Sequence, residues 1–209
     1  EIGVRLVGSE MCIRDRVKSM TRRAIKTSTY IMAPLMMGLA FCAEPIVRLV
    51  LTDKWLPCVP FLRIFCITYM FYPIHTANLN AIKAMGRSDL FLKLEIAKKS
   101  VGMTLLLSTM RFGVMAMAYS LLVSSVTSQI INSWPNRKLL NYRYWDQLKD
   151  ILPSIAIAIF VGCCVNLVGL LHLSNAATLL IQIPMGAAIY IGASAVLHLE
   201  SYEYLMGMI

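Results

Sequence analysis

The sequence predicts an all-α fold, a polytopic membrane helix bundle with six transmembrane helices. Hydrophobic residues make up 58% of the 209 residues, charged residues only 15%, and the mean hydropathy is +0.66, above the norm for soluble domains. The apolar residues form runs long enough to cross a hydrocarbon core of ~30 Å. The Lys and Arg residues gather between these runs, as they do where basic loops fix the orientation of a chain in a membrane.

The first sixteen residues differ from the rest of the chain. Leu6–Arg16 reads LVGSEMCIRDR and resembles one translated reading frame of a sequencing-library adaptor. We therefore interpret residues 1–16 as a non-native segment; the alternative is an ordinary cytoplasmic loop. The chain has neither an initiator Met nor a signal peptide, so we expect it to be a fragment whose membrane domain covers residues 17–209.

The apolar runs predict helices at about residues 27–51, 58–84, 89–110, 114–134, 151–171 and 176–199. The first contains Pro34 and Pro45, which spanning helices tolerate because neighbouring elements can satisfy the freed carbonyl groups. The second would be about 40 Å long at ~1.5 Å per residue, so we expect a tilt or a kink at Pro73. Gly86 is placed to cap this second helix.

Charged and small residues distinguish the later helices. Asp89–Lys93 and Glu95–Lys99 are spaced as i,i+4 ion pairs at the charged start of the third helix. Small or polar residues recur every four positions in the following helices, a spacing that lets membrane helices approach closely. These residues are Ala116, Ser120, Ser124, Ser128 and Asn132, then Ser154, Ala158, Gly162 and Asn166, with Ala188 and Gly192 in the last helix.

The distribution of basic residues supports this segmentation. With residues 1–16 set aside, 13 Lys and Arg residues fall on one side of the alternating helices and four on the other. Because cytoplasmic loops carry the excess of basic residues, both ends of the fragment are expected in the cytoplasm of a bacterium, with the chain crossing the cytoplasmic (inner) membrane several times. The basic residues have no interleaved base-stacking pattern, so we do not expect nucleic acid as a partner.

No pattern in the sequence indicates catalysis, a cofactor or a metal. His75, His172 and His198 lack paired ligand spacing, and no nucleotide-binding or nucleophile motif is present. The six Cys residues show no metal spacing either and fit buried reduced thiols. We therefore expect a protein that is not an enzyme.

The second helix carries a polar stripe. At 100° per residue, Tyr69, Tyr72, Thr76, Asn80 and Lys83 fall within about 80° of one another. His75 flanks the stripe and Arg87 follows it. Facing a water-filled cavity, these seven candidate pathway residues can hydrogen-bond sugar hydroxyls, with Lys83 or Arg87 attracting a diphosphate. Alternatively, they satisfy neighbouring helices and Lys83 extends to the lipid headgroups.

Two segments carry a family resemblance. AEPIVRLVLTDKWLPCVPFLRI and LNAIKAMGRSDLFLKLEIAKK resemble the C-terminal half of bacterial oligosaccharide (polysaccharide) flippases. These are Wzx-type members of the multidrug/oligosaccharidyl-lipid/polysaccharide exporter superfamily. The resemblance implies the last six of about 14 helices in a two-lobe transporter. It further implies movement of undecaprenyl-diphosphate-linked oligosaccharide across the membrane by alternating access, for surface polysaccharide synthesis. The implied partners are this lipid-linked oligosaccharide, membrane lipids and an N-terminal lobe of the same protein.

Two other functions stay open at the level of the sequence. A cation-coupled drug or toxin exporter of the same superfamily would favour a carboxylate deep in the bundle, and Glu44 near a helix end is the nearest candidate. A membrane-embedded glycan polymerase or acyltransferase would place catalytic side chains on an external loop. The predicted external loops are too short for that.

Overall fold

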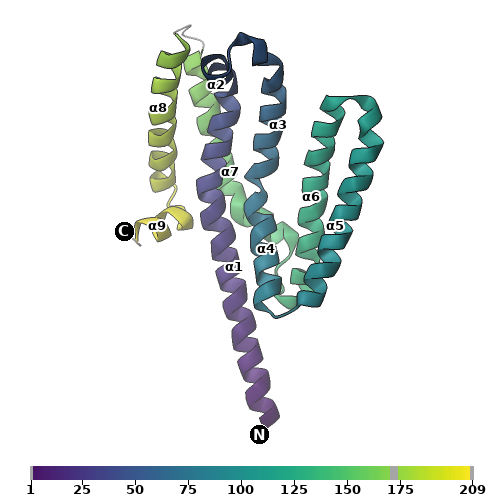
Figure 1. The fold of residues 1–209 in the computed structure, drawn as a ribbon. Coiled ribbons are helices and arrows are strands. Elements are labelled where there is room, and N and C mark those ends of the chain that lie inside the picture. Colours follow the sequence, from purple (N-terminus) through teal and green to yellow (C-terminus); the bar gives the residue numbers. More distant parts are fainter. Residues whose placement is uncertain (1, 170–173, 208–209) are drawn as a thin grey trace. The chain divides into compact units, whose positions relative to one another are not determined.

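The computed structural model describes residues 2–169 and 174–207, with side chains described from Met11 onward. Within these residues the fold is all-α, as the sequence predicts (Figure 1). The α-helices are α1 (Ile2–Phe41), α2 (Ala43–Val50), α3 (Val59–Met70), α4 (Tyr72–Ala84), α5 (Ser88–Thr109), α6 (Val114–Leu139), α7 (Tyr144–Val168), α8 (Asn175–Val196) and α9 (Glu200–Met206), and the 3-10 helices are η1 (Asp53–Cys58) and η2 (Met110–Phe112).

The first predicted helix is divided in two. α1 already begins at Ile2, includes Pro34 and ends at Phe41, and α2 follows after a bend of 67° at Cys42. Pro45 lies in the first turn of α2, where its missing N–H removes no intrahelical hydrogen bond. The proposed origin of residues 1–16 stays a prediction, because a helical conformation does not distinguish native from foreign sequence.

The second predicted helix is also interrupted, at Phe71. α3 ends at Met70 and α4 begins at Tyr72, which places Pro73 in the first turn of α4. Pro73 has no N–H group to donate to the carbonyl oxygen of Tyr69, so the hydrogen-bond series of α3 ends there. At the far end of α4, Gly86 adopts φ 68°, and the N–H groups of Gly86 and Arg87 donate to Lys83 and Ile82. This double hydrogen bond is a Schellman cap, at the glycine expected to end the helix.

The remaining helices begin or end beyond the predicted bounds in two places. α6 continues through Pro135 to Leu139, and α7 begins at Tyr144 and passes through Pro153. His172, in the last predicted external loop, lies outside the described residues.

The chain divides into two units, each described by itself. Residues 1–26 and 72–150 form the first unit, with α4, α5 and α6 together with the starts of α1 and α7. In this unit α5 and α6 form an antiparallel hairpin joined through η2 and Gly113. Residues 27–71 and 151–209 form the second unit, in which α2, α3, α8 and α9 accompany the rest of α1 and α7.

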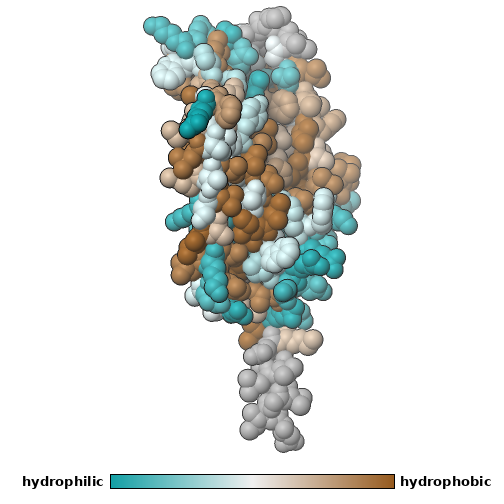
Figure 2. All heavy atoms as spheres, turned by 90° about the vertical axis from the view of Figure 1, so that its right-hand side faces the viewer, coloured by the Kyte–Doolittle hydropathy of each residue, from teal (hydrophilic) through white to brown (hydrophobic). Residues whose placement is uncertain are grey.

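Among the described residues, four helical segments are long and apolar enough to cross a membrane, judged by length and composition. These are Asp53–Ala84, Val114–Leu139, Tyr144–Val168 and Asn175–Val196, and the bent pair of α1 and α2 would be a fifth. The sixth predicted span, α5, is not among these segments. Its first half carries five charged residues, Asp89, Lys93, Glu95, Lys98 and Lys99. Figure 2 shows many exposed apolar side chains on the face that carries α5 and α6. Such exposed apolar surface is typical of a membrane or partner contact.

Small residues mark close helix contacts at some of the expected positions. A Cβ atom on Gly102 of α5 would lie 3.2 Å from Ser124 Oγ of α6, and one on Gly162 of α7 would overlap the ring of Phe41. In α8, however, the close contact lies at Gly186, whose Cβ would be 3.1 Å from Val165, whereas nothing lies within 4 Å of Gly192. The expectation for Gly192 was therefore wrong, because that residue lies on an exposed face of the helix.

Candidate functional site

Four of the candidate pathway residues share one exposed face of α4. Tyr72, Thr76, Asn80 and Lys83 lie three or four positions apart in one continuous helix, and all four are exposed. Tyr69 is exposed as well, but it belongs to α3, beyond the break at Phe71 and in the second unit. The structure thus brings together four of the five stripe residues. Their role in a substrate pathway stays a prediction.

The polar groups of this α4 face differ in their availability. Thr76 Oγ1 donates to the carbonyl oxygen of Tyr72 at 3.3 Å, within the same helix. In the described part of the chain, the side-chain amide of Asn80 makes no hydrogen bond. Asn80 is therefore the residue of the stripe best able to bind a hydroxyl-rich ligand.

His75 lies at the edge of the same face and is held by α6. Its Nδ1 atom is 2.9 Å from Nδ2 of Asn132, and its ring stacks on Tyr72 with centroids 5.7 Å apart. Which of the two groups donates depends on the tautomer of His75. The contact fixes the ring and leaves its Nε2 atom for a further hydrogen bond.

Two cations lie at the turn between α4 and α5. Lys83 Nζ is 4.6 Å from the ring centroid of Phe91, and Arg87 forms two contacts of 3.2 and 3.3 Å with the carboxylate of Asp89. The hydrogen bond from Arg87 to Asp89 raises the pKa of the guanidinium group. Because the ring leaves the charge of Lys83 uncompensated whereas Asp89 neutralises Arg87, Lys83 is the better anion-binding candidate of the two.

The opposite face of α4 holds a buried amide network. Asn78 Nδ2 donates to Gln147 Oε1 at 2.7 Å, and Gln147 Nε2 donates to Asn78 Oδ1 at 3.1 Å. Asn136 Nδ2 donates to the same Asn78 Oδ1 at 2.7 Å, and Ser133 Oγ lies 3.1 Å from Asn78 Nδ2. All four side chains are buried. These hydrogen bonds join α4, α6 and α7 within the first unit, while the Oδ1 atom of Asn136 is buried without a hydrogen-bond partner among the described residues.

Sequence reasoning missed most of this network. Asn78 appears in the polar part of the second predicted helix, but it points away from the stripe, and Asn136 and Gln147 lie where a polar loop was expected. A usable signal was the spacing of Asn132 and Asn136, one turn apart at the end of a small-residue ridge. Extending the helix through Pro135 would have placed both on one face.

The ion pairs of α5 differ from the expected ones. Glu95 pairs with Lys98, three positions away, and Asp89 pairs with Arg87. The expected pairs Asp89–Lys93 and Glu95–Lys99 are absent from the described residues. Lys98 is buried with 7% of its side chain exposed, so the carboxylate of Glu95 compensates a charge that the helix contact takes out of solvent.

A second charged cluster joins α1 to the start of α7. Asp150 accepts hydrogen bonds from Arg22 at 2.7 and 2.8 Å, and its Oδ1 atom lies 3.3 Å from Lys26 Nζ. The hydroxyl of Tyr142 donates to Asp150 Oδ2 at 2.7 Å. Burial and this hydrogen bond raise the pKa of Tyr142. These contacts fix the α6–α7 connection to α1 within the first unit.

The second unit has an apolar cavity with few polar groups. A cavity of ≈ 500 Å³ lies among α1, α2, α7 and α8. Gln182 on its wall accepts a hydrogen bond from Cys42 Sγ at 3.3 Å and donates to the carbonyl oxygen of Val165 at 3.0 Å. The hydroxyl of Tyr190 donates to the carbonyl oxygen of Tyr30 at 2.9 Å. These polar side chains are therefore used in helix contacts.

The described residues contain no group of three or more His, Cys, Asp and Glu side chains that could hold a metal ion. His198 contacts Glu203 at 3.1 Å, next to the end of α8. The six thiols are free, with Cys42 and Cys66 buried as expected and Cys12 and Cys163 exposed.

Comparison with protein families gives a match to part of the chain. Residues 13–60, which contain most of α1, all of α2 and η1 and the first residues of α3, match the model of a family described as polysaccharide biosynthesis protein. The match begins at residue 13, inside the segment of residues 1–16 that we interpret as non-native. Neither the curated proteins nor the solved structures include a significant match to the chain.

Proposed function

We propose that the chain is part of a membrane transporter that moves lipid-linked oligosaccharide across the bacterial cytoplasmic membrane for surface polysaccharide synthesis. The observation that carries the proposal is the match of residues 13–60 to polysaccharide biosynthesis proteins, in a chain with four or five helical segments able to cross a membrane. The lipid carrier would be a polyprenyl diphosphate such as undecaprenyl diphosphate. The chain would act together with an N-terminal lobe of the same protein.

The exposed face of α4 supplies the groups that such a cargo requires. The side-chain amide of Asn80 and the Nε2 atom of His75 suit sugar hydroxyls, which can both donate and accept, because a neutral glycan is recognised by directed hydrogen bonds. Lys83 suits the diphosphate, because within the described residues its ammonium group contacts the Phe91 ring and no carboxylate. In this proposal alternating access exposes the face first to the cytoplasm and then to the outside.

The basic residues support an orientation for this transporter. With 13 Lys and Arg residues on one side and four on the other, the α4–α5 and α6–α7 connections would lie in the cytoplasm. Lys83 would then meet the diphosphate on the side where the lipid-linked precursor is made.

A coupled drug exporter of the same superfamily is less well supported. In α5 the carboxylate of Glu95 is partly buried and pairs with the buried ammonium group of Lys98. A cation-coupled exporter needs a carboxylate that can bind and release the coupling ion. If Glu95 bound such an ion, the buried ammonium group of Lys98 would lose its partner, which is costly.

Complementation of a bacterial strain that lacks its own flippase tests the proposal. The full-length gene product should restore surface polysaccharide and remove the accumulated lipid-linked precursor from the inner leaflet. Normal membrane insertion with continued accumulation of precursor would contradict it. Transferase turnover by the full-length protein without precursor movement would favour the polymerase or acyltransferase alternative.

A further inference from the structure

The short helix α2 turns sharply away from the long helix that precedes it. The bend at Cys42 measures 67°, and Figure 1 shows α2 at the end of α1 that is remote from the N-terminus. The eight residues of α2 measure about 12 Å at ~1.5 Å per residue, so α2 advances only about 5 Å along the axis of α1. α2 therefore adds little to a membrane crossing.

The contact at the bend places α2 near the ends of the neighbouring helices. Cys42 Sγ donates to Gln182 Oε1 at 3.3 Å, and Gln182 lies about 10 Å from the start of α8 at Asn175, at ~1.5 Å per residue. The 22 residues of α8 measure about 33 Å, close to the ~30 Å of a hydrocarbon core. If α8 crosses the membrane, α2 thus lies within about 10 Å of one surface and not at the centre.

Two sides of α2 already have partners within the second unit. Ala43 and Val47 are buried in an apolar core. Glu44 and Arg48, one turn apart, form an ion pair of 2.9 Å, and Arg48 also lies 3.2 Å from Asp53 of η1. These three charged residues form the charged side of the segment. They are exposed and neutralise one another in part, so this side suits contact with water.

The third side of α2 is apolar and has no partner among the described residues. Leu49 is 54% exposed, and Trp55 in the adjoining η1 is 58% exposed. Ile46 shares this side with Leu49, which lies about 150° around the helix from the charged side at 100° per residue. Ile46 also lines the cavity of ≈ 500 Å³ together with Ile183 of α8. Ile183 is itself exposed on a candidate membrane span, so the apolar side of α2 is continuous with that surface.

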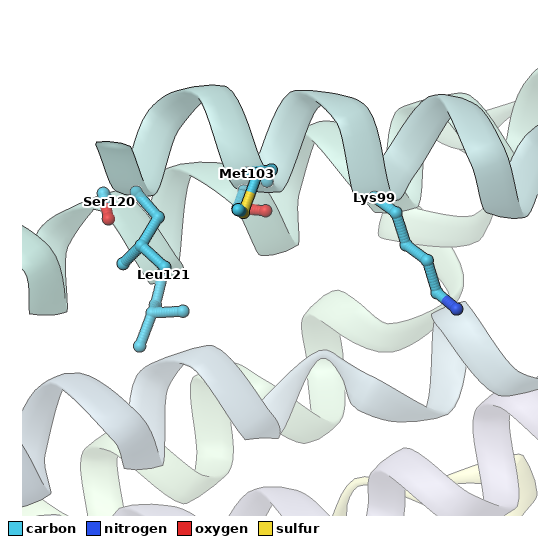
Figure 3. A pocket seen from close by; sticks show the side chains of 7 residues that line it. Lys99, Met103, Ser120 and Leu121 are labelled. Atoms are coloured by element: carbon cyan, nitrogen blue, oxygen red, sulfur yellow. The ribbon is translucent and has the colours of Figure 1, made fainter. Parts of the chain in front are cut away.

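Exposed apolar side chains alone would not place α2 at a membrane interface. Met103 and Leu121 are exposed as well (Figure 3), but they belong to the long helices α5 and α6, of 22 and 26 residues. α2 differs because it is short, is bent away from α1 and carries charged and apolar residues on opposite sides. This combination is typical of a helix that lies in the plane of the membrane interface.

We propose that α2 and η1 form an interfacial segment that binds the boundary between the phospholipid headgroups and the acyl chains. Its apolar side, formed by Ile46, Leu49 and Trp55, contacts the acyl chains, and its charged side faces water. Tryptophan favours this depth because its ring is apolar while its N–H group can reach a polar partner. The assignment needs the second unit to lie in a membrane, but it does not require glycan transport.

Depth-dependent fluorescence quenching of Trp55 tests the assignment. The full chain with Trp134→Phe and Trp145→Phe keeps Trp55 as its single tryptophan. It is reconstituted in phosphatidylcholine vesicles whose acyl chains carry bromine either near the headgroup or near the terminal methyl group. We expect the bromine near the headgroup to quench Trp55 more strongly. Equal or stronger quenching by the deep bromine would overturn the proposal, and so would the absence of quenching by either lipid.

A second pair of variants tests the orientation of α2 about its own axis. With Trp55→Phe added, a single tryptophan is introduced by Leu49→Trp on the apolar side or by Glu44→Trp on the charged side. Arg48 keeps Asp53 as a partner in Glu44→Trp. We expect the bromine near the headgroup to quench the tryptophan of Leu49→Trp, and aqueous acrylamide to quench that of Glu44→Trp. The same response at both positions would overturn the proposed orientation.

Discussion

The Nδ2 atom of Asn78 lies 2.7 Å from Oε1 of Gln147, and the return bond from Gln147 Nε2 to Asn78 Oδ1 measures 3.1 Å. Both side chains are fully buried. This reciprocal amide pair joins α4 to α7 on the face opposite the polar stripe. Two faces of one helix thus have separate tasks, since the buried face stabilises the first unit and the exposed face stays available to a ligand.

Replacing Asn78 with Leu should destabilise the first unit. The substitution leaves the amides of Gln147 and Asn136 buried with fewer partners, which costs about 1–3 kcal/mol in the free energy of unfolding. Thermal unfolding of the detergent-solubilised protein measures the loss. Asn80→Leu, two positions along on the exposed face, is the matched control and should shift the transition little. Equal shifts for the two variants would show that the amide network does not stabilise the unit.

Substitutions on the exposed face of α4 should impair glycan export rather than stability. In the complete protein, Asn80→Leu and Lys83→Leu should each lower glycan export about tenfold, the equivalent of losing one hydrogen bond to a charged ligand or a similar contact of ~1.4 kcal/mol. Membrane insertion should stay intact. Surface polysaccharide per inserted protein is the measurement, and Lys93→Leu controls for loss of an exposed cation. Unchanged export in both variants would return the stripe to a role in helix packing.

Gly162 should not tolerate a side chain. A Cβ atom there overlaps the Phe41 ring, so Gly162→Ala should lower the free energy of unfolding by about 1–3 kcal/mol through overpacking. Gly192→Ala, with nothing within 4 Å of the added atom, should be neutral or slightly stabilising. The two thermal transitions are compared directly, and Phe41→Ala should rescue Gly162→Ala. A Gly162→Ala protein as stable as Gly192→Ala would refute the close approach of α1 and α7.

The contribution of Tyr142 to stability should decrease at alkaline pH. Burial and the hydrogen bond to Asp150 raise its pKa in the folded state, whereas the unfolded tyrosine ionises near ~10. Its stabilising contribution is therefore complete below pH ~10 and is lost as the pH rises further. Tyr142→Phe should be about 1 kcal/mol less stable at neutral pH, and the difference from the natural protein should shrink between pH 10 and 11. A difference that is constant over this range would contradict the assignment.

The sequence predicted the fold class and the places of the helices because long apolar runs leave few alternatives to helix. It also predicted the Gly86 cap and the interruption near Pro73, both of which follow from backbone geometry. It did not predict the bend at Cys42 or the continuation of α6 past Pro135. Whether a proline ends a helix depends on the contacts that replace its lost hydrogen bond, and these come from neighbouring helices.

The candidate site was predicted only in part, because contacts from neighbouring helices decide its details as well. Helical spacing places Tyr72, Thr76, Asn80 and Lys83 on one face, and the structure agrees. Spacing alone cannot choose between Lys98 and Lys99 as the partner of Glu95, since both i,i+3 and i,i+4 pairs are within reach. Burial of Lys98 against the neighbouring helices decides the pairing, because an unpaired buried charge is costly. The amide network was missed because its members come from three helices.

Transport in proteoliposomes tests the central claim most directly. The purified full-length protein is reconstituted with a fluorescent polyprenyl-diphosphate oligosaccharide, and a membrane-impermeant reagent reports the fraction of label in the outer leaflet over time. The account predicts that label moves between leaflets in vesicles that contain the protein and that Lys83→Leu slows this movement. Label that stays in its starting leaflet, despite correctly inserted protein, would contradict the account.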